Sequence, residues 1–489
     1  MSRNANLIAQ TLLNSKTGIL LALFAAMPLA QAQTFLPSDA NASCTVVPTT
    51  FNGWFASGTP AKNGVVVPAN SIAFQSSTAN PPAPNTINCN FYQWSQQMFL
   101  WATSPVGKQR VFSSPTFYTM AANGELLPNT PGLIHHFEVR KGKPINTTID
   151  QAGGSPVLMA QGNQMVFYSV HVNDVYALFA KQNPNPPATL QFPTTQAQLN
   201  TILSTAGKKS LPDQNALAIE LKISWIQAQK GDEANFVTMT AEIPTFTQNS
   251  TTLWTQSGKK KVLLKMIGMH VVGSVANHPE LIWATYEYNS NAVNSTYSYL
   301  NASGPVTVTQ PASQNMLLAA NNAPAPFNVA NMKFIPATTS PKAPATIAAI
   351  SPNTITASNT ARLFPWGANG SVVPNPLVTS AAQSNTEVIS INNNVLKMMP
   401  AGDVRNNYLF MGATWTDGGF APTSANQVGT SSLANTTMET YDTVAKGTNN
   451  CFGCHNTASG SLAPVQTPSV PANTGVSHIF SSLITTKVK

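Results

Sequence analysis

Residues 218–225 read AIELKISW, an alternation of apolar and polar side chains that predicts a half-buried β-strand. Residues 165–170, 235–243, 262–273 and 282–288 are similarly rich in β-branched and aromatic side chains, which favour strands. Charged residues make up 9% of the chain, which favours long polar loops over a helical bundle. We therefore expect an α+β, β-rich protein with a large mixed β domain.

Helical spacing recurs at two places beside these strands. Residues 90–102 carry large apolar side chains about one helical turn apart, which predicts an amphipathic helix. These side chains are Phe91, Trp94, Met98 and Trp101. Such a stripe usually packs in a core, and contact with a cofactor is the alternative interpretation. Residues 195–205 are expected to form a second helix, with Leu199 and Leu203 on one face.

The remaining stretches divide the chain by composition. Residues 33–88 are polar and rich in Asn, Pro and Ser, and we expect them to form an irregular arm. A connector rich in Pro, Ala and Ser is predicted at about residues 336–360. Residues 386–420 return to strand-like patterns. Together these segments place the main domain at residues 33–430.

Residues 451–455 read CFGCH, and this pentapeptide carries most of the functional information in the chain. The two thiols of a Cys-x-x-Cys-His sequence add to the vinyl groups of haem, and the histidine supplies a nitrogen ligand to the iron. One helical turn would bring Cys451 and Cys454 to the same porphyrin edge, with His455 as the axial ligand. A zinc site would need a second pair of ligands nearby, and a thioredoxin-like thiol pair would need a βαβ context. The sequence around residue 451 indicates neither.

Residues 1–32 have the features of a bacterial secretory signal peptide. Basic residues precede an apolar run over residues 18–29, and Ala30-Gln31-Ala32 is a small-x-small cleavage site. Covalent attachment of haem also takes place outside the cytoplasm, so the signal and the motif support each other. We expect a periplasmic or secreted protein with no transmembrane segment once the signal is removed.

Cys44 and Cys89 are the other two cysteines of the chain. An even pair of cysteines in an exported protein most often forms a disulfide. The bond would tie the N-terminal arm to the body of the protein, and we expect it to be structural.

The motif and the export signal together resemble the c-type cytochromes. The resemblance implies one covalently attached haem c, an iron bound by His455, and single-electron transfer to or from a periplasmic or extracellular redox partner. Too little chain follows His455 to build the familiar small cytochrome fold. We therefore expect residues 431–489 to be a short, mostly helical or irregular haem-binding segment. In it, Thr436 and Glu439 form a capping box that predicts a helix ending at Gly447.

The sixth iron ligand is the most open part of this interpretation. His478 is the best candidate because it follows the motif closely and lies among the apolar residues Val476, Ile479 and Phe480. A packed or surface histidine is the alternative. Lower-ranked candidates are His270, His278, His135, His136, His171, Met398 and Met399.

Two other functions stay open, because the main domain is far larger than a simple electron carrier needs. One is a haem enzyme of the peroxidase or oxygenase type, with an open sixth site and His270, His278 or the pair His135 and His136 as its acid–base group. The other is a ligand-binding or sensor module in which haem is structural. The net charge of +8 arises from scattered Lys and Arg, so we expect no nucleic-acid partner.

Overall fold

The protein was analysed as a computed structural model. It describes residues 36–74, 86–121, 125–130, 135–137, 156–187, 189–309, 316–323, 325–367, 380–422, 427–430, 432–442, 451–455, 476–477 and 479–480. The predicted signal peptide, residues 1–32, lies outside the described residues. These residues form an α+β, β-rich fold, as expected. Their α-helices are α1 (Pro48–Trp54), α2 (Thr86–Ala102), α3 (Asp174–Gln182), α4 (Gln196–Thr205), α5 (Ala381–Met398) and α7 (Cys451–Cys454).

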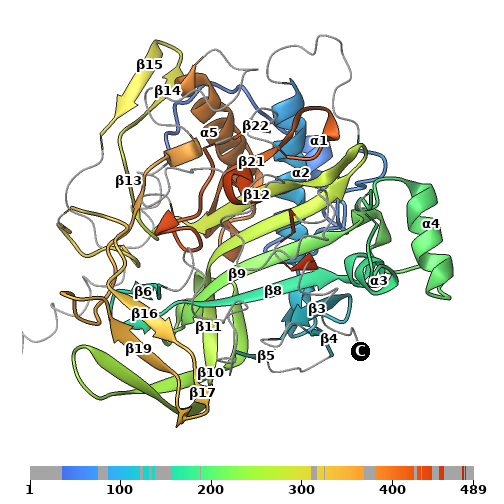
Figure 1. The fold of residues 1–489 in the computed structure, drawn as a ribbon. Helices are drawn as coiled ribbons and strands as arrows, with labels where there is room; N and C mark the ends of the chain where they lie inside the picture. Colours follow the sequence, from blue (N-terminus) through green and yellow to red (C-terminus); the bar gives the residue numbers. More distant parts are fainter. Residues whose placement is uncertain are drawn as a thin grey trace, which may run out of the picture.

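One sheet of twelve strands organises the molecule (Figure 1). Its main path is antiparallel throughout and runs in the order β22 (Gln427–Gly429), β21 (Tyr408–Thr416), β12 (His278–Tyr288), β11 (Leu253–Val275), β9 (Ile219–Gln227), β8 (Phe167–Asn173), β3 (Phe117–Met120) and β4 (Leu126–Pro128). Strands that join it off this path are β10 (Thr238–Gln248), β5 (His135–His136), β16 (Met332–Ile335) and β19 (Thr346–Ala349).

Five small two-stranded sheets surround it. They are β1 (Pro105–Val106) with β2 (Gln109–Arg110), β6 (Met159–Ala160) with β7 (Gln164–Met165), β13 (Val293–Asn294) with β20 (Ala361–Arg362), β14 (Tyr297–Asn301) with β15 (Gly304–Val308), and β17 (Thr338–Thr339) with β18 (Lys342–Ala343).

The strands and helices predicted from periodicity are confirmed. The AIELKISW stretch lies in β9, and the four segments resembling it lie in β7 and β8, β10, β11 and β12. The helices expected at residues 90–102 and 195–205 are α2 and α4. The alternation in β9 points Leu221 and Ile223 to one face of the sheet and Glu220 and Lys222 to the other.

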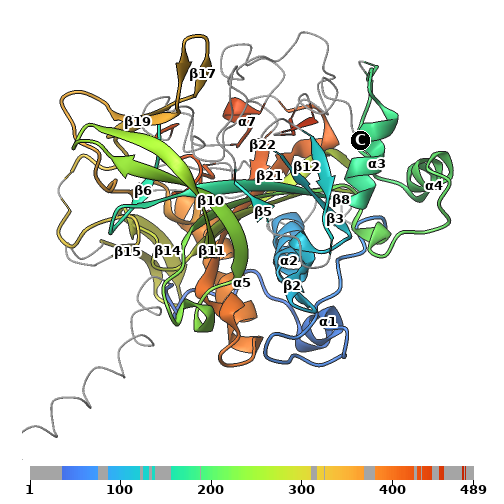
Figure 2. The same cartoon turned by 90° about the horizontal axis from the view of Figure 1, so that it is seen from below.

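The two faces of the sheet are covered differently. Helices α2 and α5 pack on one face, and α7 lies on the opposite face (Figure 2). We call these the inner face and the outer face. Apolar side chains of the strands fill the inner face; there Phe99 of α2 stacks on Tyr286 of β12 with ring centroids 4.0 Å apart. This side forms the larger hydrophobic core of the protein.

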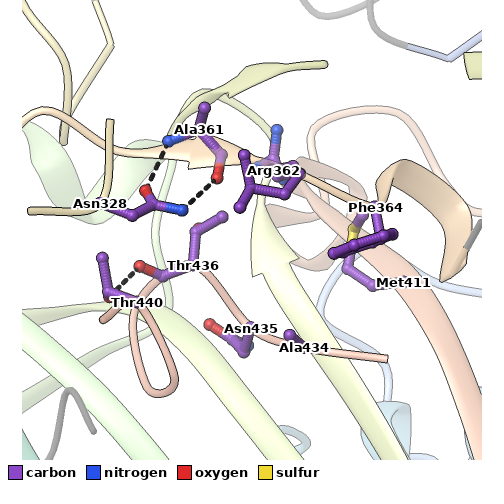
Figure 3. Close-up of a pocket in the computed structure, with 10 residues that line it drawn as sticks. Asn328, Ala361, Arg362, Phe364, Met411, Ala434, Asn435, Thr436 and Thr440 are labelled. Carbon is purple, nitrogen blue, oxygen red and sulfur yellow. Dashed lines mark hydrogen bonds between the residues drawn. The ribbon is translucent and has the colours of Figure 1, made fainter. Parts of the chain in front are cut away.

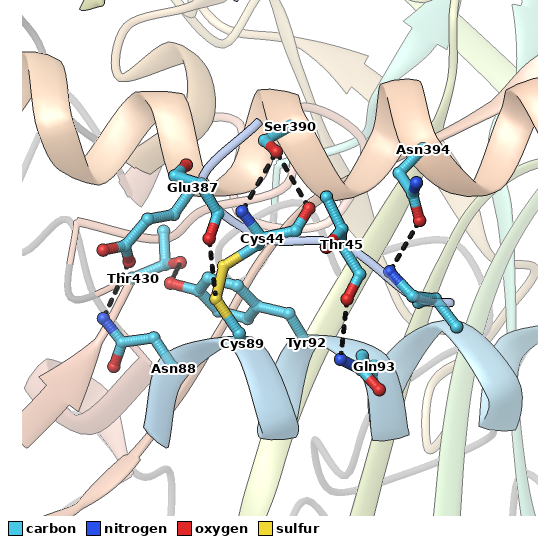
Figure 4. The surroundings of a disulfide bond; sticks show 12 residues. Cys44, Thr45, Asn88, Cys89, Tyr92, Gln93, Glu387, Ser390, Asn394 and Thr430 are labelled. Atoms are coloured by element: carbon cyan, nitrogen blue, oxygen red, sulfur yellow. Dashed lines mark hydrogen bonds between the residues drawn. A yellow bond between two sulfur atoms is a disulfide. The ribbon is translucent and has the colours of Figure 1, made fainter. Parts of the chain in front are cut away.

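The arm before α2 is more ordered than expected. It contains α1, whose Phe51 and Trp54 are buried in the core. The predicted disulfide between Cys44 and Cys89 is confirmed and joins the arm to α2 (Figure 4). Beside it, the backbone of Cys44 exchanges two hydrogen bonds with the Ser390 hydroxyl of α5. The disulfide and these hydrogen bonds together join the arm, α2 and α5 on the inner face.

The strand-like interpretation of residues 386–420 is wrong for its first part. Residues 381–398 form α5, whereas Tyr408–Thr416 form the expected strand. Val388, Ile389 and Ile391 gave the stretch a strand-like composition, but α5 is buried on several sides, so its apolar residues do not follow a single stripe. Its buried polar side chains instead find distant partners, as when Asn392 bonds the backbone of Phe410.

The predicted connector also contributes to the sheet. Within it, β19 pairs with both β11 and β16. No helix among the described residues is long and apolar enough to cross a membrane.

Candidate functional site

The Cys-x-x-Cys-His sequence forms a single helical turn. Helix α7 spans Cys451–Cys454, and the His455 N–H donates a hydrogen bond to the Cys451 carbonyl oxygen at 2.8 Å. Phe452, between the cysteines, is buried in an apolar cluster on the outer face, while Cys451 is half-buried at its edge. The side chain of Cys454 lies outside the described residues. The turn is therefore held to the sheet by Phe452.

Trp283 of β12 contacts two residues of this turn. Its ring lies 4.7 Å from the His455 ring, centroid to centroid, at an interplanar angle of 37°. The Phe452 ring meets the same indole edge-on at 6.1 Å. Trp283 is itself buried, with 3% of its surface exposed. The indole thus packs against the imidazole of His455.

The outer face around Trp283 carries an unusual number of polar side chains. Strand register places Lys222, His270 and Thr285 side by side on neighbouring strands. A second row of residues paired across β9, β11 and β12 lies on one side of this one and contains Glu220, Val272 and Trp283. A third row lies on the other side and contains Ser224, Gly268 and Glu287. The alternation of apolar and polar residues in β9 would by itself suggest that this polar face is exposed to solvent. Instead, the C-terminal segment covers this face of the sheet.

Residues 435–441 bond directly to these rows. Asn435 donates to Thr285 Oγ1, and the hydroxyls of Thr437 and Ser224 are 2.6 Å apart. Gly268 is required there, because a Cβ at this position would lie within 2.8 Å of the Ser224 hydroxyl and closer still to that of Thr437. The polar groups of the segment and of the sheet therefore satisfy one another in a buried setting.

Glu439 occupies the centre of this contact. Its Oε1 lies 2.9 Å from His270 Nε2 and 4.0 Å from Lys222 Nζ, and its Oε2 accepts the Asn435 N–H. Burial alone would raise the pKa of Glu439, but the charges of His270 and Lys222 and these hydrogen bonds outweigh it and lower the pKa to about 2. Glu439 therefore remains a carboxylate at any ordinary pH.

The predicted capping box is shifted by one residue. Glu439 reaches back to the N–H of Asn435 rather than of Thr436, and the Asn435 side chain caps the Thr437 N–H. Residues 436–441 form turns, and the first helical residue is Asp442. The predicted helix end at Gly447 lies outside the described residues. Thr436 is used differently because its N–H and hydroxyl both donate to the buried Glu287.

Glu287 also forms an ion pair with Arg362, at 2.9 Å, with both side chains almost fully buried. A small pocket lies next to this pair, between Asn328, Arg362, Met411 and the turn at Asn435–Thr440 (Figure 3). Its polar walls bond to one another, Asn328 to the Ala361 backbone and Thr440 to the Thr436 backbone. We therefore assign the pocket no ligand.

A second piece of the C-terminal segment docks on the same face. The Ser477 hydroxyl donates to Glu220 Oε2 and accepts the N–H groups of Ile479 and Phe480, in the manner of a helix N-cap. Its fourth partner is the Tyr176 hydroxyl, at 2.6 Å. Burial and the nearby charge of Glu220 raise the pKa of Tyr176 well above its usual value, so this hydroxyl remains a donor.

His478 itself lies outside the described residues. Its neighbours Ser477 and Ile479 are buried, and Ile479 belongs to the same apolar cluster as Phe452 and Trp283. Glu220 and Trp283 both pair with Val272 of β11, so the two docking points lie two strands apart, about 10 Å.

The other candidate ligands are distributed over both faces. His270 faces the same side as His455 and is bonded to Glu439. His135 and His171 lie on the inner face, where both Nδ1 atoms contact the Thr119 hydroxyl. Burial lowers the pKa of both, to about 4 for His135.

The last four lie away from the motif. His136 is exposed and paired with Glu242. His278 packs against Phe91 of α2, while Met398 and Met399 pack in the inner core. The helix stripe of Phe91 and its neighbours packs there too, as its core interpretation predicts.

Sequence reasoning missed Trp283 as a contact of the motif, and Glu220 and Glu287 as residues that hold the C-terminal segment on the sheet. The two glutamates carry no spacing signal, and the available hint was an acidic residue within an otherwise apolar strand. Among the described residues, no three His, Cys, Asp or Glu side chains gather in a group that would hold a metal ion. Comparisons with protein-family models, curated proteins and solved structures found no match to this chain.

Proposed function

We propose that this protein is an exported monohaem c-type cytochrome that transfers single electrons. Cys451 and Cys454 would hold haem c through thioether bonds, and His455 would bind the iron. The observation that carries the proposal is the helical turn of Cys451–Cys454 with the His455 ring packed on Trp283. When bound, haem supplies a one-electron couple between ferric and ferrous iron.

The donor set fits this group. Cys451 is half-buried at the border of an apolar cluster, a setting suited to a largely apolar macrocycle. The packing of His455 against Trp283 would restrict rotation of the imidazole, which keeps a ligand aimed at a metal. Phe452 anchors the turn to the sheet, so the thiols and the imidazole would move as one unit.

We propose His478 as the sixth ligand. Its neighbours Ser477 and Ile479 are fixed on the outer face, near the docking point of α7. The sheet separates His135, His171, His278, Met398 and Met399 from that face, and Glu439 engages His270. Two protein ligands would leave no open iron position, which suits electron transfer better than a reaction at the metal.

The test is the absorption spectrum of the mature protein, produced with its haem-maturation machinery, in both oxidation states with and without CO. We expect a low-spin spectrum that does not respond to CO. A high-spin spectrum that shifts with CO would instead support the enzyme alternative, and a protein without covalent haem would refute both.

Two histidine variants sharpen this test. H478A should become high-spin and bind CO, whereas H136A, which changes an exposed histidine on the edge strand β5, should keep the low-spin spectrum. An unchanged spectrum in H478A would remove His478 as the ligand. N-terminal sequencing of the same preparation tests removal of residues 1–32, which the disulfide between Cys44 and Cys89 supports through its need for an oxidising compartment.

A further inference from the structure

Trp283 stands at one end of a continuous line of contacts that leaves the motif. Beyond its contact with His455, the indole Nε1–H donates a hydrogen bond to the carbonyl oxygen of Glu280 at 3.3 Å. Leu281, between them, has a backbone φ of 73°, a value that residues other than glycine seldom adopt. The strand is therefore distorted where it connects the indole to Glu280.

The line continues through a buried pair. Glu280 is fully buried, and its Oε1 lies 2.8 Å from His278 Nδ1. The same oxygen accepts the N–H of Thr416 on the neighbouring strand β21. His278, at the turn between β11 and β12, is 8% exposed and packs against Phe91 of α2. These contacts therefore connect Trp283, beside the motif, to His278 at the start of β12.

The surface end of this line is the short turn η7 (Asp417–Gly419) that follows β21. Gly419 is packed so closely that an added Cβ would collide with the Asn277 carbonyl and lie 3.6 Å from Glu280 Oε2. The next residue, Phe420, is held by a bond from Thr416 Oγ1 to its carbonyl, and 70% of it is exposed. It is the most exposed large apolar residue among those described.

We propose that Trp283 and the Glu280–His278 pair form the route by which electrons pass between His455 and the surface at Phe420. This rests on the proposed haem. One electron lost by a one-electron donor at this surface would be gained at the His455 end, and no bond would be made or broken. Tunnelling slows steeply as gaps between packed groups widen, so an indole in contact with His455 and followed by hydrogen bonds favours this path.

The experiment injects an electron at a known place. A ruthenium tris(bipyridine) photosensitiser is attached to F420C in the haem-loaded protein, and haem reduction is followed by absorbance after a laser flash. We expect W283L to slow this reduction severalfold, because it removes the ring that bridges to His455. W283F keeps an aromatic ring and should slow it less.

The matched control carries the same label at L253C, another partly exposed apolar position, at the start of β11. Reduction from this position should be slowed by W283L much less than reduction from F420C, because any change at His455 affects both positions and only the second loses its route. Equal slowing from both positions, or no slowing from either, would refute the route while leaving the haem proposal intact. Absence of haem in the unlabelled parent would instead refute the proposed function itself.

Discussion

The two faces of the central sheet are stabilised in different ways. On the inner face, apolar residues of the strands pack against α2 and α5, and the disulfide joins the N-terminal arm to α2. On the outer face, Glu220, Ser224, His270, Thr285 and Glu287 are buried under a chain segment that bonds to each of them. Apolar burial holds the first face, whereas the second combines an apolar cluster around Phe452 with hydrogen bonds to the C-terminal segment. The added hydrogen bonds fix that segment in one position on the outer face.

The motif belongs to the second face. Hydrogen bonds depend on direction and distance, so the outer face specifies where the segment lies more tightly than apolar contact would. The loss of one hydrogen-bond partner on this face leaves a buried polar group unsatisfied, which lowers the stability of the fold. Variants on the two faces should therefore fail in different ways.

The largest effect is expected from Phe99→Ala on the inner face. The substitution removes a ring stacked on Tyr286 and leaves a cavity, which should lower the free energy of unfolding by about 3–5 kcal/mol. Urea denaturation followed by tryptophan fluorescence measures this loss. We expect amide exchange of residues 436–441 to change no more than that of β9, and selective opening of the segment would contradict the comparison.

Glu287→Gln should have the next largest effect. It breaks a buried ion pair with Arg362 and weakens both bonds to Thr436, at a cost of about 3 kcal/mol. Hydrogen exchange should show faster opening of residues 436–441 than of β9. If both regions open together, the outer face is not a separate unit.

Ser477→Ala tests the second docking point. Loss of the hydroxyl removes the bond to Glu220 and the cap of Phe480, which should cost about 2 kcal/mol. Tyr176→Phe removes one bond to the same hydroxyl and serves as a milder control. Urea denaturation compares the two, and a larger loss in the control would contradict this account of Ser477.

Glu439→Gln should have a smaller effect than these, about 1 kcal/mol, because 32% of the side chain is exposed and water screens its charge. The folded pKa of about 2 lies below the ordinary value of 4.5, so the contribution is complete above pH 4.5 and is lost as the pH falls through 2. Stability measured from pH 7 to 2 should therefore converge for the variant and the parent.

Glu242 offers a matched control for that measurement. It is equally exposed and also pairs with a histidine, but His136 is itself exposed. Glu242→Gln should change stability by less than about 0.5 kcal/mol. If Glu242→Gln lowered the free energy of unfolding as much as Glu439→Gln, the position of Glu439 on the outer face would add no stability to its ion pair.

Much of the sheet could be predicted from the sequence, because alternation in β9 and its neighbours reports which side chains share a face. The prediction failed at α5, where burial on several sides removes the helical stripe, and the capping box was misplaced by one residue. The candidate site was predicted at Cys451, Cys454 and His455 because haem attachment requires two cysteines and a histidine at this spacing in the sequence. Its supports were not predicted, because Trp283 and Glu287 look like ordinary strand residues.

By itself, the sequence determined the strand pattern, the cysteine pair and the motif, because each depends only on local spacing or on residue type. Only the tertiary structure decided that the polar side of β9 is buried and which segment buries it. Ser224 meets Thr437 across 213 residues and Glu220 meets Ser477 across 257. A periodic strand fixes where its side chains point, but their partners are fixed by the path of the whole chain.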